Sequence, residues 1–369
     1  MIKKQTLCAG TWGKLNELED KSRPLKREAL EFLGGLLIRY KDRDHEPAQL
    51  LGGEATGPSI CDLADALLKD YVQQTGVNWS TRTVLGRNPF LAKDTDIIRV
   101  RFPDWSLWNL PLMAHEFGHL AALATPDFIK LKTEFQQDTI PPTLYDNPQG
   151  KLLSSQQYIE ARRQHLDEFF ADVFATYTFG PAFACASILH QFNPAQAYIW
   201  RGAHPTHDER VQVILLTLQA MNEKTRSASH DPGIYALVIA QLRQVWNESL
   251  KSCHANPDNL DIYNFQLRQT QRWAWHLYNM IDRFYRLGAC YKPEQWKLAV
   301  EASERLKCLP YPTIEQLQEK VTKYPSLDSI SLKDFVNAFW YARTGEAYKP
   351  PFLPQVSAHL GNNYLRISK

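Results

Sequence analysis

The stretch at residues 107–124, LWNLPLMAHEFGHLAALA, contains the sequence His115-Glu116-Phe117-Gly118-His119. This is an H-E-x-x-H pattern. On a helix, residues four apart lie on one face, so the two histidine rings can bind the same zinc ion. The glutamate after the first histidine can then reach a metal-bound water as a general base. The pattern therefore predicts a helix that carries a zinc site able to hydrolyse a substrate.

The residues around the motif favour a buried helix, because they are apolar apart from the motif itself and Asn109. Buried polar groups need partners, and a metal ion would supply them. The alternative is a helix that carries two surface histidines by coincidence. Gly118 costs about 1 kcal/mol of helix propensity relative to alanine. A small residue there would let another backbone or the substrate approach closely.

A zinc site of this kind needs a third protein ligand, and the best candidate lies in HLDEFFADVFA at residues 165–175. The phenylalanines and valine of this segment predict a buried helix. Glu168 and Asp172 would share one face of it. We expect Glu168 to bind the metal and Asp172 to accept a hydrogen bond from a ligand histidine, which would fix its tautomer. His165 is the main rival to Glu168 and Asp167 a weaker one, while acidic residues facing solvent are the alternative for the whole segment.

A third polar segment, HPTHDERV at residues 204–211, precedes an apolar helical run. A loop that carries His204 and His207 can reach a metal cleft. The alternative is a plain helix start, with Pro205 in the first turn and Asp208 and Glu209 complementing the helix dipole.

The order H-E-x-x-H, E-x-x-x-D, H-P-x-x-x-x-R resembles the metallopeptidases of the HtpX and CAAX-prenyl endopeptidase type, within the gluzincins. The matching residues are His115, Glu116, His119, Glu168, Asp172, His204, Pro205 and Arg210. The resemblance implies zinc bound by His115, His119 and Glu168, with Glu116 as the general base. It also implies that His204 approaches the metal or the oxyanion and that Arg210 orients it or anchors its loop.

A second group is also similar, namely small intracellular gluzincin-like proteases that cleave regulators. Those proteases share H-E-x-x-H and a second pattern that EFFADVFA at residues 168–175 also fits. The H-P-x-x-x-x-R segment favours the first group. No stretch of about 18 or more residues is uniformly apolar, which separates this chain from the membrane members of that group.

We expect a mainly α (α+β) fold, with a gluzincin-like catalytic core in which a small sheet lies beside the H-E-x-x-H helix. The core would span residues 79–222, between a helical N-terminal region at 1–78 and a helical C-terminal domain at 223–369. Apolar spacing predicts a helix over 14–41, and Thr, Val and Ile enrichment predicts strands over 81–85 and 95–102. By resemblance, the strand at 96–102 would pair with an extended substrate.

Composition limits the partners and the compartment. The 369 residues carry a net charge of only +2, which argues against nucleic acid or an anionic membrane as a main partner. The six cysteines show no C-x-x-C spacing, which is typical of reduced thiols in a cytoplasmic protein. The aromatic side chains after residue 222 are expected to be buried between helices rather than to form a partner surface or a stacking platform for bases.

The function predicted from these features is a soluble zinc-dependent endopeptidase acting on a protein or peptide substrate. His204, His207 and Tyr177 are the candidates to stabilise the oxyanion. The helical flanks leave room for a regulatory protein partner. One alternative keeps the zinc but makes the enzyme an aminopeptidase or amidase. The other is a non-catalytic helical interaction protein with a structural or vestigial zinc site, against which an intact Glu116 argues.

Overall fold

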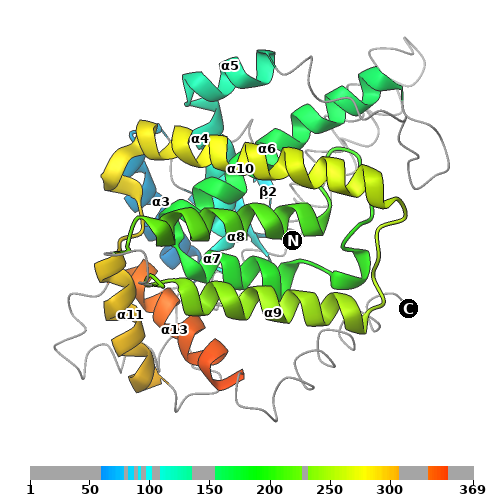
Figure 1. Ribbon diagram of the computed structural model, residues 1–369. Helices are drawn as coiled ribbons and strands as arrows, with labels where there is room; N and C mark the ends of the chain where they lie inside the picture. Colours follow the sequence, from blue (N-terminus) through cyan, green and yellow to red (C-terminus); the bar gives the residue numbers. More distant parts are fainter. Residues whose placement is uncertain are drawn as a thin grey trace, which may run out of the picture. The chain divides into compact units, whose positions relative to one another are not determined.

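The computed structural model describes residues 60–78, 82–86, 90–92, 97–101, 109–134, 154–226, 232–306 and 331–347. The helix expected over 14–41 lies outside these ranges, as do residues 81, 95, 96 and 102 of the two expected strands. The described residues are mainly helical, as the sequence predicts (Figure 1).

The helices are α3 (Ile60–Thr75), α4 (Leu112–Leu123), α5 (Pro126–Glu134), α6 (Ser155–Phe179), α7 (Pro181–Ala186), α8 (His207–Glu223), α9 (Ala236–Ser252), α10 (Leu260–Ala289), α11 (Pro293–Leu306) and α13 (Leu332–Ala347). A π-helical turn, Ser187–Gln191, and a 3-10 turn, Pro194–Gln196, join α7 to the loop before α8. None of the helices within the described ranges combines the length and the apolar content needed to cross a lipid bilayer.

Helix α6 packs against α4, α8 and α10 and so connects the elements around the site. It begins at a capping box, in which Ser154 and Gln157 satisfy each other's free backbone N–H groups. It ends at Gly180, whose φ of +77° favours glycine, and Pro181 then opens α7. A side chain at Gly180 would also collide with the ring of Tyr291.

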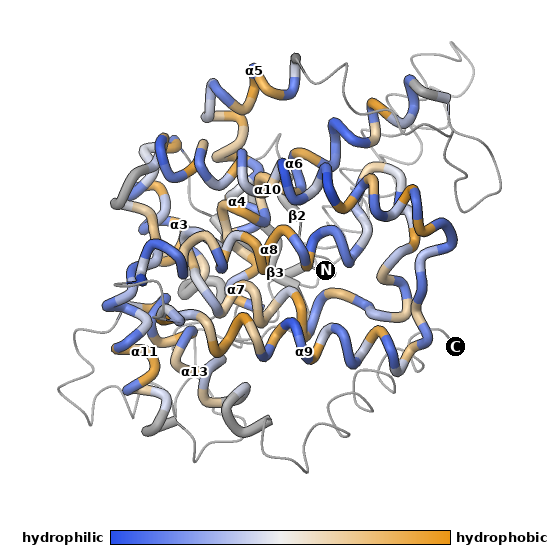
Figure 2. The backbone as a smooth tube through the Cα atoms, viewed as in Figure 1, coloured by the Kyte–Doolittle hydropathy of each residue, from blue (hydrophilic) through white to orange (hydrophobic). Residues whose placement is uncertain are grey.

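Helix α8 lies between α10 and α9, and the three run side by side in Figure 1. Its first turn is closed by a second capping box, formed by Thr206 and Glu209. Hydrophilic and hydrophobic residues alternate along α9 in Figure 2, as expected for a helix with one buried face. The buried face of α9 consists of Val238, Ile239, Leu242, Trp246 and Ser249.

Three short strands precede α4: β1 (Arg82–Gly86), β2 (Phe90–Ala92) and β3 (Ile97–Arg101). They pair in the order β1-β3-β2, with β1 parallel and β2 antiparallel to β3. Residues of β2 and β3 contact α4, and residues of β1 contact α3.

Many of the described aromatic residues that follow position 222 belong to the same hydrophobic core as α4 and α6. The buried ones are Tyr235, Trp246, Trp273, Tyr278, Tyr285, Tyr291, Trp296, Phe335, Phe339 and Trp340. Trp275 and Phe284 are largely exposed. The expectation of buried helix packing is therefore confirmed for most of these side chains.

Candidate metal centre

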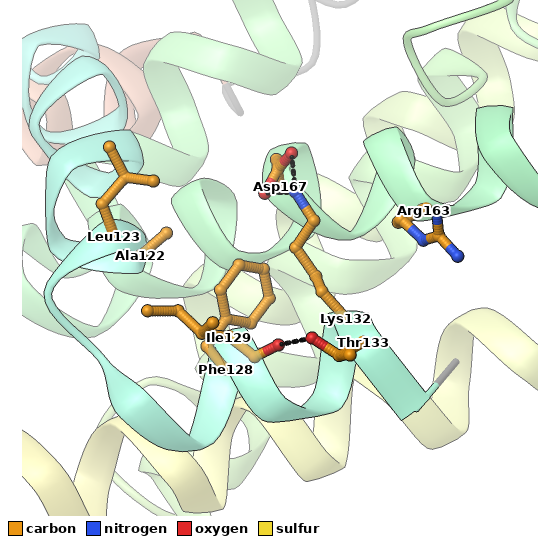
Figure 3. A pocket seen from close by; sticks show the side chains of 8 residues that line it. All are labelled: Ala122, Leu123, Phe128, Ile129, Lys132, Thr133, Arg163 and Asp167. Atoms are coloured by element: carbon orange, nitrogen blue, oxygen red, sulfur yellow. Dashed lines mark hydrogen bonds and ion pairs between the residues drawn. The ribbon is translucent and has the colours of Figure 1, made fainter. Parts of the chain in front are cut away.

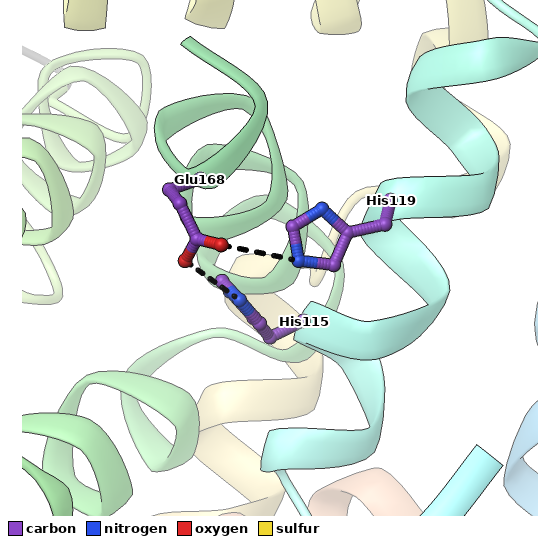
Figure 4. Close-up of side chains that lie close together, drawn as sticks. All are labelled: His115, His119 and Glu168. Carbon is purple, nitrogen blue, oxygen red and sulfur yellow. Dashed lines mark ion pairs between the residues drawn. The ribbon is translucent and has the colours of Figure 1, made fainter. Parts of the chain in front are cut away.

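Two histidines and a glutamate, side chains that can bind metal ions, meet where α4 packs on α6. His115 and His119 project from one face of α4, and Glu168 faces them from α6 (Figure 4). His115 Nε2 lies 3.5 Å from Glu168 Oε2, and His119 Nε2 lies 3.7 Å from Glu168 Oε1. These separations are longer than ordinary hydrogen bonds. They approach the value of about 3.3–3.4 Å expected of two atoms that bind one tetrahedral zinc at about 2.0–2.1 Å. One ligand atom of each residue lies within 4.8 Å of the other two, so the three side chains could hold a metal ion.

The centre is closed on one side and open on the other. His115 and Glu168 are only 6% and 9% exposed, whereas His119 and Glu116 are partly exposed. Glu116 lies close enough for its charge to raise the pKa of Arg210, so the general-base candidate is near the same cluster. A catalytic zinc site needs this combination of three protein ligands and an accessible face.

The close approach of α4 and α6 depends on Gly118. A Cβ atom at this position would lie 2.8 Å from the Cα atom of Ala171 on α6. Side chains essentially never approach backbone so closely, and backbone cannot rotate out of the way. Glycine therefore lets the two histidines of α4 and the glutamate of α6 come within reach of one ion.

Asp172, one turn after Glu168, orients the first histidine. Its Oδ1 atom lies 2.9 Å from Nδ1 of His115. We assign the proton to Nδ1, because a carboxylate accepts and the ring must donate to it. In the neutral ring the lone pair of Nε2 would then face Glu168, which is the tautomer that a metal ligand requires.

Arg210 of α8 holds both carboxylates of α6. Its Nε and Nη2 atoms donate to the two oxygens of Asp172 at 2.8 and 2.7 Å, a bidentate pair. Its Nη1 atom lies 3.3 Å from Glu168 Oε2. All three side chains are almost completely buried, so solvent screens this interaction little.

These contacts decide the charge of each group. Burial alone raises the pKa of Glu168 and Asp172, but the positive charge of Arg210 and the hydrogen bonds around them lower both pKa values below the usual range. Burial alone lowers the pKa of His115, but the charge of Asp172 and the hydrogen bonds with Asp172 and Glu168 together raise it to about 9. In the metal-free protein His115 therefore binds a proton in the place where a ligand histidine would bind the metal.

The charges of the cluster also favour a divalent cation. Glu116, Glu168 and Asp172 contribute three negative charges, and Arg210 contributes one positive charge. Two negative charges remain when both ligand histidines are neutral, and a zinc ion would neutralise them. Buried charge without compensation is costly, so this balance supports a metal site.

His204 is the histidine of the loop before α8 that reaches the centre. Its Nδ1 atom lies 3.2 Å from Glu168 Oε1, and its side chain is 62% exposed. The backbones of Arg201 and His204 pair across a tight turn at Gly202, whose φ is +66°. His204 therefore lies at the solvent side of the glutamate and contacts the oxygen that also faces His119.

The other two oxyanion candidates point elsewhere. Nδ1 of His207 accepts a hydrogen bond of 2.8 Å from the backbone N–H of Asn193. Burial lowers the pKa of this ring to about 4, so it is neutral. Tyr177 donates its hydroxyl proton to Asp282 of α10 at 3.0 Å. Of the three candidates, the structure brings His204 alone into contact with Glu168.

The two alternatives to Glu168 as third ligand, His165 and Asp167, both form bonds with other residues. Asp167 pairs with Lys132 of α5 at 2.6 Å (Figure 3). That pair borders a pocket of about 520 Å³, separate from the triad, which Ala122, Leu123, Phe128 and Ile129 line with apolar surface. The ring of His165 bonds to Arg162 and to the backbone of Gly202.

Sequence reasoning missed the pair formed by Arg162 and Glu209. Both side chains are buried, and Arg162 Nη1 donates to Glu209 Oε1 at 2.6 Å. The sequence predicts for Glu209 only a charge that complements the start of a helix. The signal that was available is the spacing of Thr206 and Glu209, which matches the capping box T-x-x-E. No sequence signal distinguishes Arg162 from an exposed arginine of the same polar helix.

Comparison of the chain with known protein families, with curated proteins and with solved structures found no match.

Proposed function

We propose that the chain is a zinc-dependent endopeptidase with a gluzincin-like core formed by α4, α6, the start of α8 and the short strands before α4. The observation that carries this proposal is the cluster of His115, His119 and Glu168, with donor atoms at 3.5 and 3.7 Å. The order of the three motifs, which resembles that of the HtpX and CAAX-prenyl endopeptidase type, supports it.

Each residue of the centre has a role in hydrolysis. A zinc ion held by the three ligands would polarise the scissile carbonyl and lower the pKa of a bound water towards about 7. Glu116 would accept the proton of that water and pass it to the leaving amine. Asp172 holds His115 with Nε2 directed at the ligand position, and Arg210 holds Glu168 and Asp172 in place.

His204 is proposed to stabilise the oxyanion. Its ring is exposed and lies beside Glu168, whereas the rings of His207 and Tyr177 are directed at Asn193 and Asp282. A donor that acts on a developing negative charge must stand on the open side of the metal. His204 meets that requirement because its contact with Glu168 lies on the side of His119.

The experiment that tests the proposal combines metal content with digestion of unstructured casein. The wild type should carry close to one zinc per chain and cleave casein, and His119→Ala should lose both. Glu116→Gln should keep the zinc and lose activity by about 10²-fold or more. Glu223→Gln, which changes an exposed carboxylate at the end of α8, is the matched control and should behave as wild type. Full activity of Glu116→Gln would refute the mechanism.

Two further measurements separate the alternatives. Cleavage of peptides with a blocked N-terminus supports an endopeptidase, whereas cleavage only of peptides with a free amine indicates an aminopeptidase. Removal of zinc by a chelator should silence a catalytic centre and leave the fold intact. Unfolding on chelation, with no hydrolysis at any zinc concentration, would indicate a structural site instead.

The proposed setting is the cytoplasm, with a protein or peptide as the substrate and a regulatory protein as a further partner of the helical flanks. Cys185, Cys253 and Cys290 are free thiols among the described residues. Neither a nucleic acid nor a membrane is proposed as a partner.

A further inference from the structure

A buried polar group lies beneath the loop that carries His204. His165 and Arg162 come from the first half of α6, and neither side chain has measurable exposure. His165 Nε2 lies 2.7 Å from the carbonyl oxygen of Gly202, and His165 Nδ1 lies 3.0 Å from Nη1 of Arg162. The ring of Trp200 packs against His165 at a centroid distance of 4.7 Å.

The donors and acceptors in this group follow from the chemistry of arginine. A guanidinium only donates, so Nδ1 of His165 must accept from Arg162. The proton of the neutral ring then sits on Nε2, which donates to the carbonyl of Gly202. Burial and the charge of Arg162 lower the pKa of His165 to about 3, so the ring stays neutral at physiological pH. Arg162 thus fixes the one tautomer that can hold the loop.

The same guanidinium also holds the other end of the loop. Nη1 of Arg162 donates to Oε1 of Glu209 at 2.6 Å. The second oxygen of Glu209 accepts from the backbone N–H and the hydroxyl of Thr206, both at 3.1 Å. Residues 202 and 206 are therefore both tied to Arg162 through one intermediate side chain. His204 lies halfway between them and contacts Glu168.

We propose that His165 is a positioning residue, oriented by Arg162, which holds the Gly202 carbonyl so that His204 stays beside Glu168 on the open side of the metal centre. The proposal deepens the proposed function and rests on it for the catalytic consequence. The claim about loop geometry is independent of catalysis. A helical segment that needed only to fill space could use apolar residues at both positions, because a buried guanidinium is costly, and here the Nε and Nη2 atoms of Arg162 have no hydrogen-bond partner among the described residues.

The decisive variants are His165→Phe and His165→Gln. Phenylalanine keeps an aromatic ring against Trp200 but has no N–H, whereas the amide of glutamine can donate from about the position of Nε2. The control is Leu277→Ala, which removes a buried side chain of α10 and should lower the melting temperature while residues 162, 165 and 201–206 keep their side chains. The readout is amide hydrogen exchange, measured on the zinc-loaded protein without substrate.

We expect His165→Phe to raise exchange in residues 201–206 by about tenfold, the equivalent of one lost hydrogen bond. His165→Gln should restore most of the protection. Leu277→Ala should raise exchange in residues 201–206 no more than it raises exchange in α6 and α8. The proposal is overturned if His165→Phe leaves this segment as protected as in wild type. It is equally overturned if exchange rises as much throughout α6 and α8 as in the loop.

Kinetics test the link to His204. If His165 acts through His204, His165→Phe should lower kcat/KM in the wild-type background and change it less than twofold in a His204→Ala background. Zinc content should be unchanged in all variants. Fully additive effects would refute the link. If the wild type hydrolyses nothing, the proposed function fails, and the exchange measurement still decides whether His165 holds the loop.

Discussion

Replacement of Gly118 by alanine sets two physical effects against each other. Alanine has the higher helix propensity, so in the middle of α4 it should stabilise the protein by about 1 kcal/mol. The new methyl group, however, would lie 2.8 Å from Cα, 3.1 Å from O and 3.2 Å from Cβ of Ala171. Ordinary contact begins at 3.4 Å, so the helices must part by about 0.6 Å.

Moving the two helices apart should destabilise the protein by more than the higher helix propensity of alanine stabilises it. Overpacking of a filled core typically costs about 1–3 kcal/mol, so the metal-free Gly118→Ala variant should be less stable than wild type by up to about 2 kcal/mol. The histidines of α4 would also withdraw from Glu168, from 3.5 and 3.7 Å to beyond about 4 Å. Zinc affinity should therefore fall at least about tenfold.

Gly288 provides the matched control. It lies in α10, and a Cβ atom there meets nothing within 4 Å, so Gly288→Ala should show the propensity gain alone, up to about 1 kcal/mol. Urea unfolding in the presence of a chelator measures stability, and titration against a competing chelator measures the zinc Kd. The reasoning is wrong if Gly118→Ala is stabilised as much as Gly288→Ala and binds zinc like wild type.

Three further predictions concern the polar residues around the centre. Asp172→Asn should remove the charge that pairs bidentately with Arg210 and leave Glu168 as its remaining carboxylate, lowering stability by up to about 3 kcal/mol and zinc affinity by about 10–100-fold, which urea unfolding and zinc titration measure. Burial lowers the pKa of His115, but the charge of Asp172 and the hydrogen bonds with Asp172 and Glu168 together raise it to about 9, so a proton competes with zinc below that pH. The zinc Kd should consequently rise about tenfold for each unit of pH lowered from 8 to 6, and a Kd independent of pH would contradict this. Thr206→Ala should cost about 1 kcal/mol in urea unfolding through loss of the capping box with Glu209, and an unchanged midpoint would show that the cap contributes nothing.

The spacing of residues in the sequence predicts part of the site. Two histidines four residues apart on an apolar helix must share a face, and the same holds for Glu168 and Asp172. Periodicity says nothing about which helices meet, because about fifty residues separate the two motifs. The expectation that α4 and α6 meet came from chemistry, since a pair of buried histidines with an adjacent base lacks a third ligand.

The buried ion pair of Arg162 and Glu209 could not be predicted from the spacing of residues. Arg162 lies in a polar segment that resembles any solvated helix face, yet its side chain is fully buried beside Trp273, with the guanidinium 4.6 Å from that ring. Burial of a charge depends on the neighbours that α8 and α10 supply, and neither neighbour is encoded in the periodicity of α6. Tertiary packing therefore determines that Arg162 pairs with Glu209. It also determines that His204, rather than His207, contacts Glu168.

The first turn of α8 unites these observations, because its consecutive residues bind different parts of the protein. Asp208 accepts hydrogen bonds from Trp246 of α9 and Tyr263 of α10, Glu209 pairs with Arg162 of α6, and Arg210 pairs with Asp172. A shift of this turn along its axis would break all of these bonds at once, so α8 has a single position that satisfies them. The loop with His204 ends at that turn. The geometry of the open side of the centre is consequently determined by buried polar contacts that bind no metal themselves.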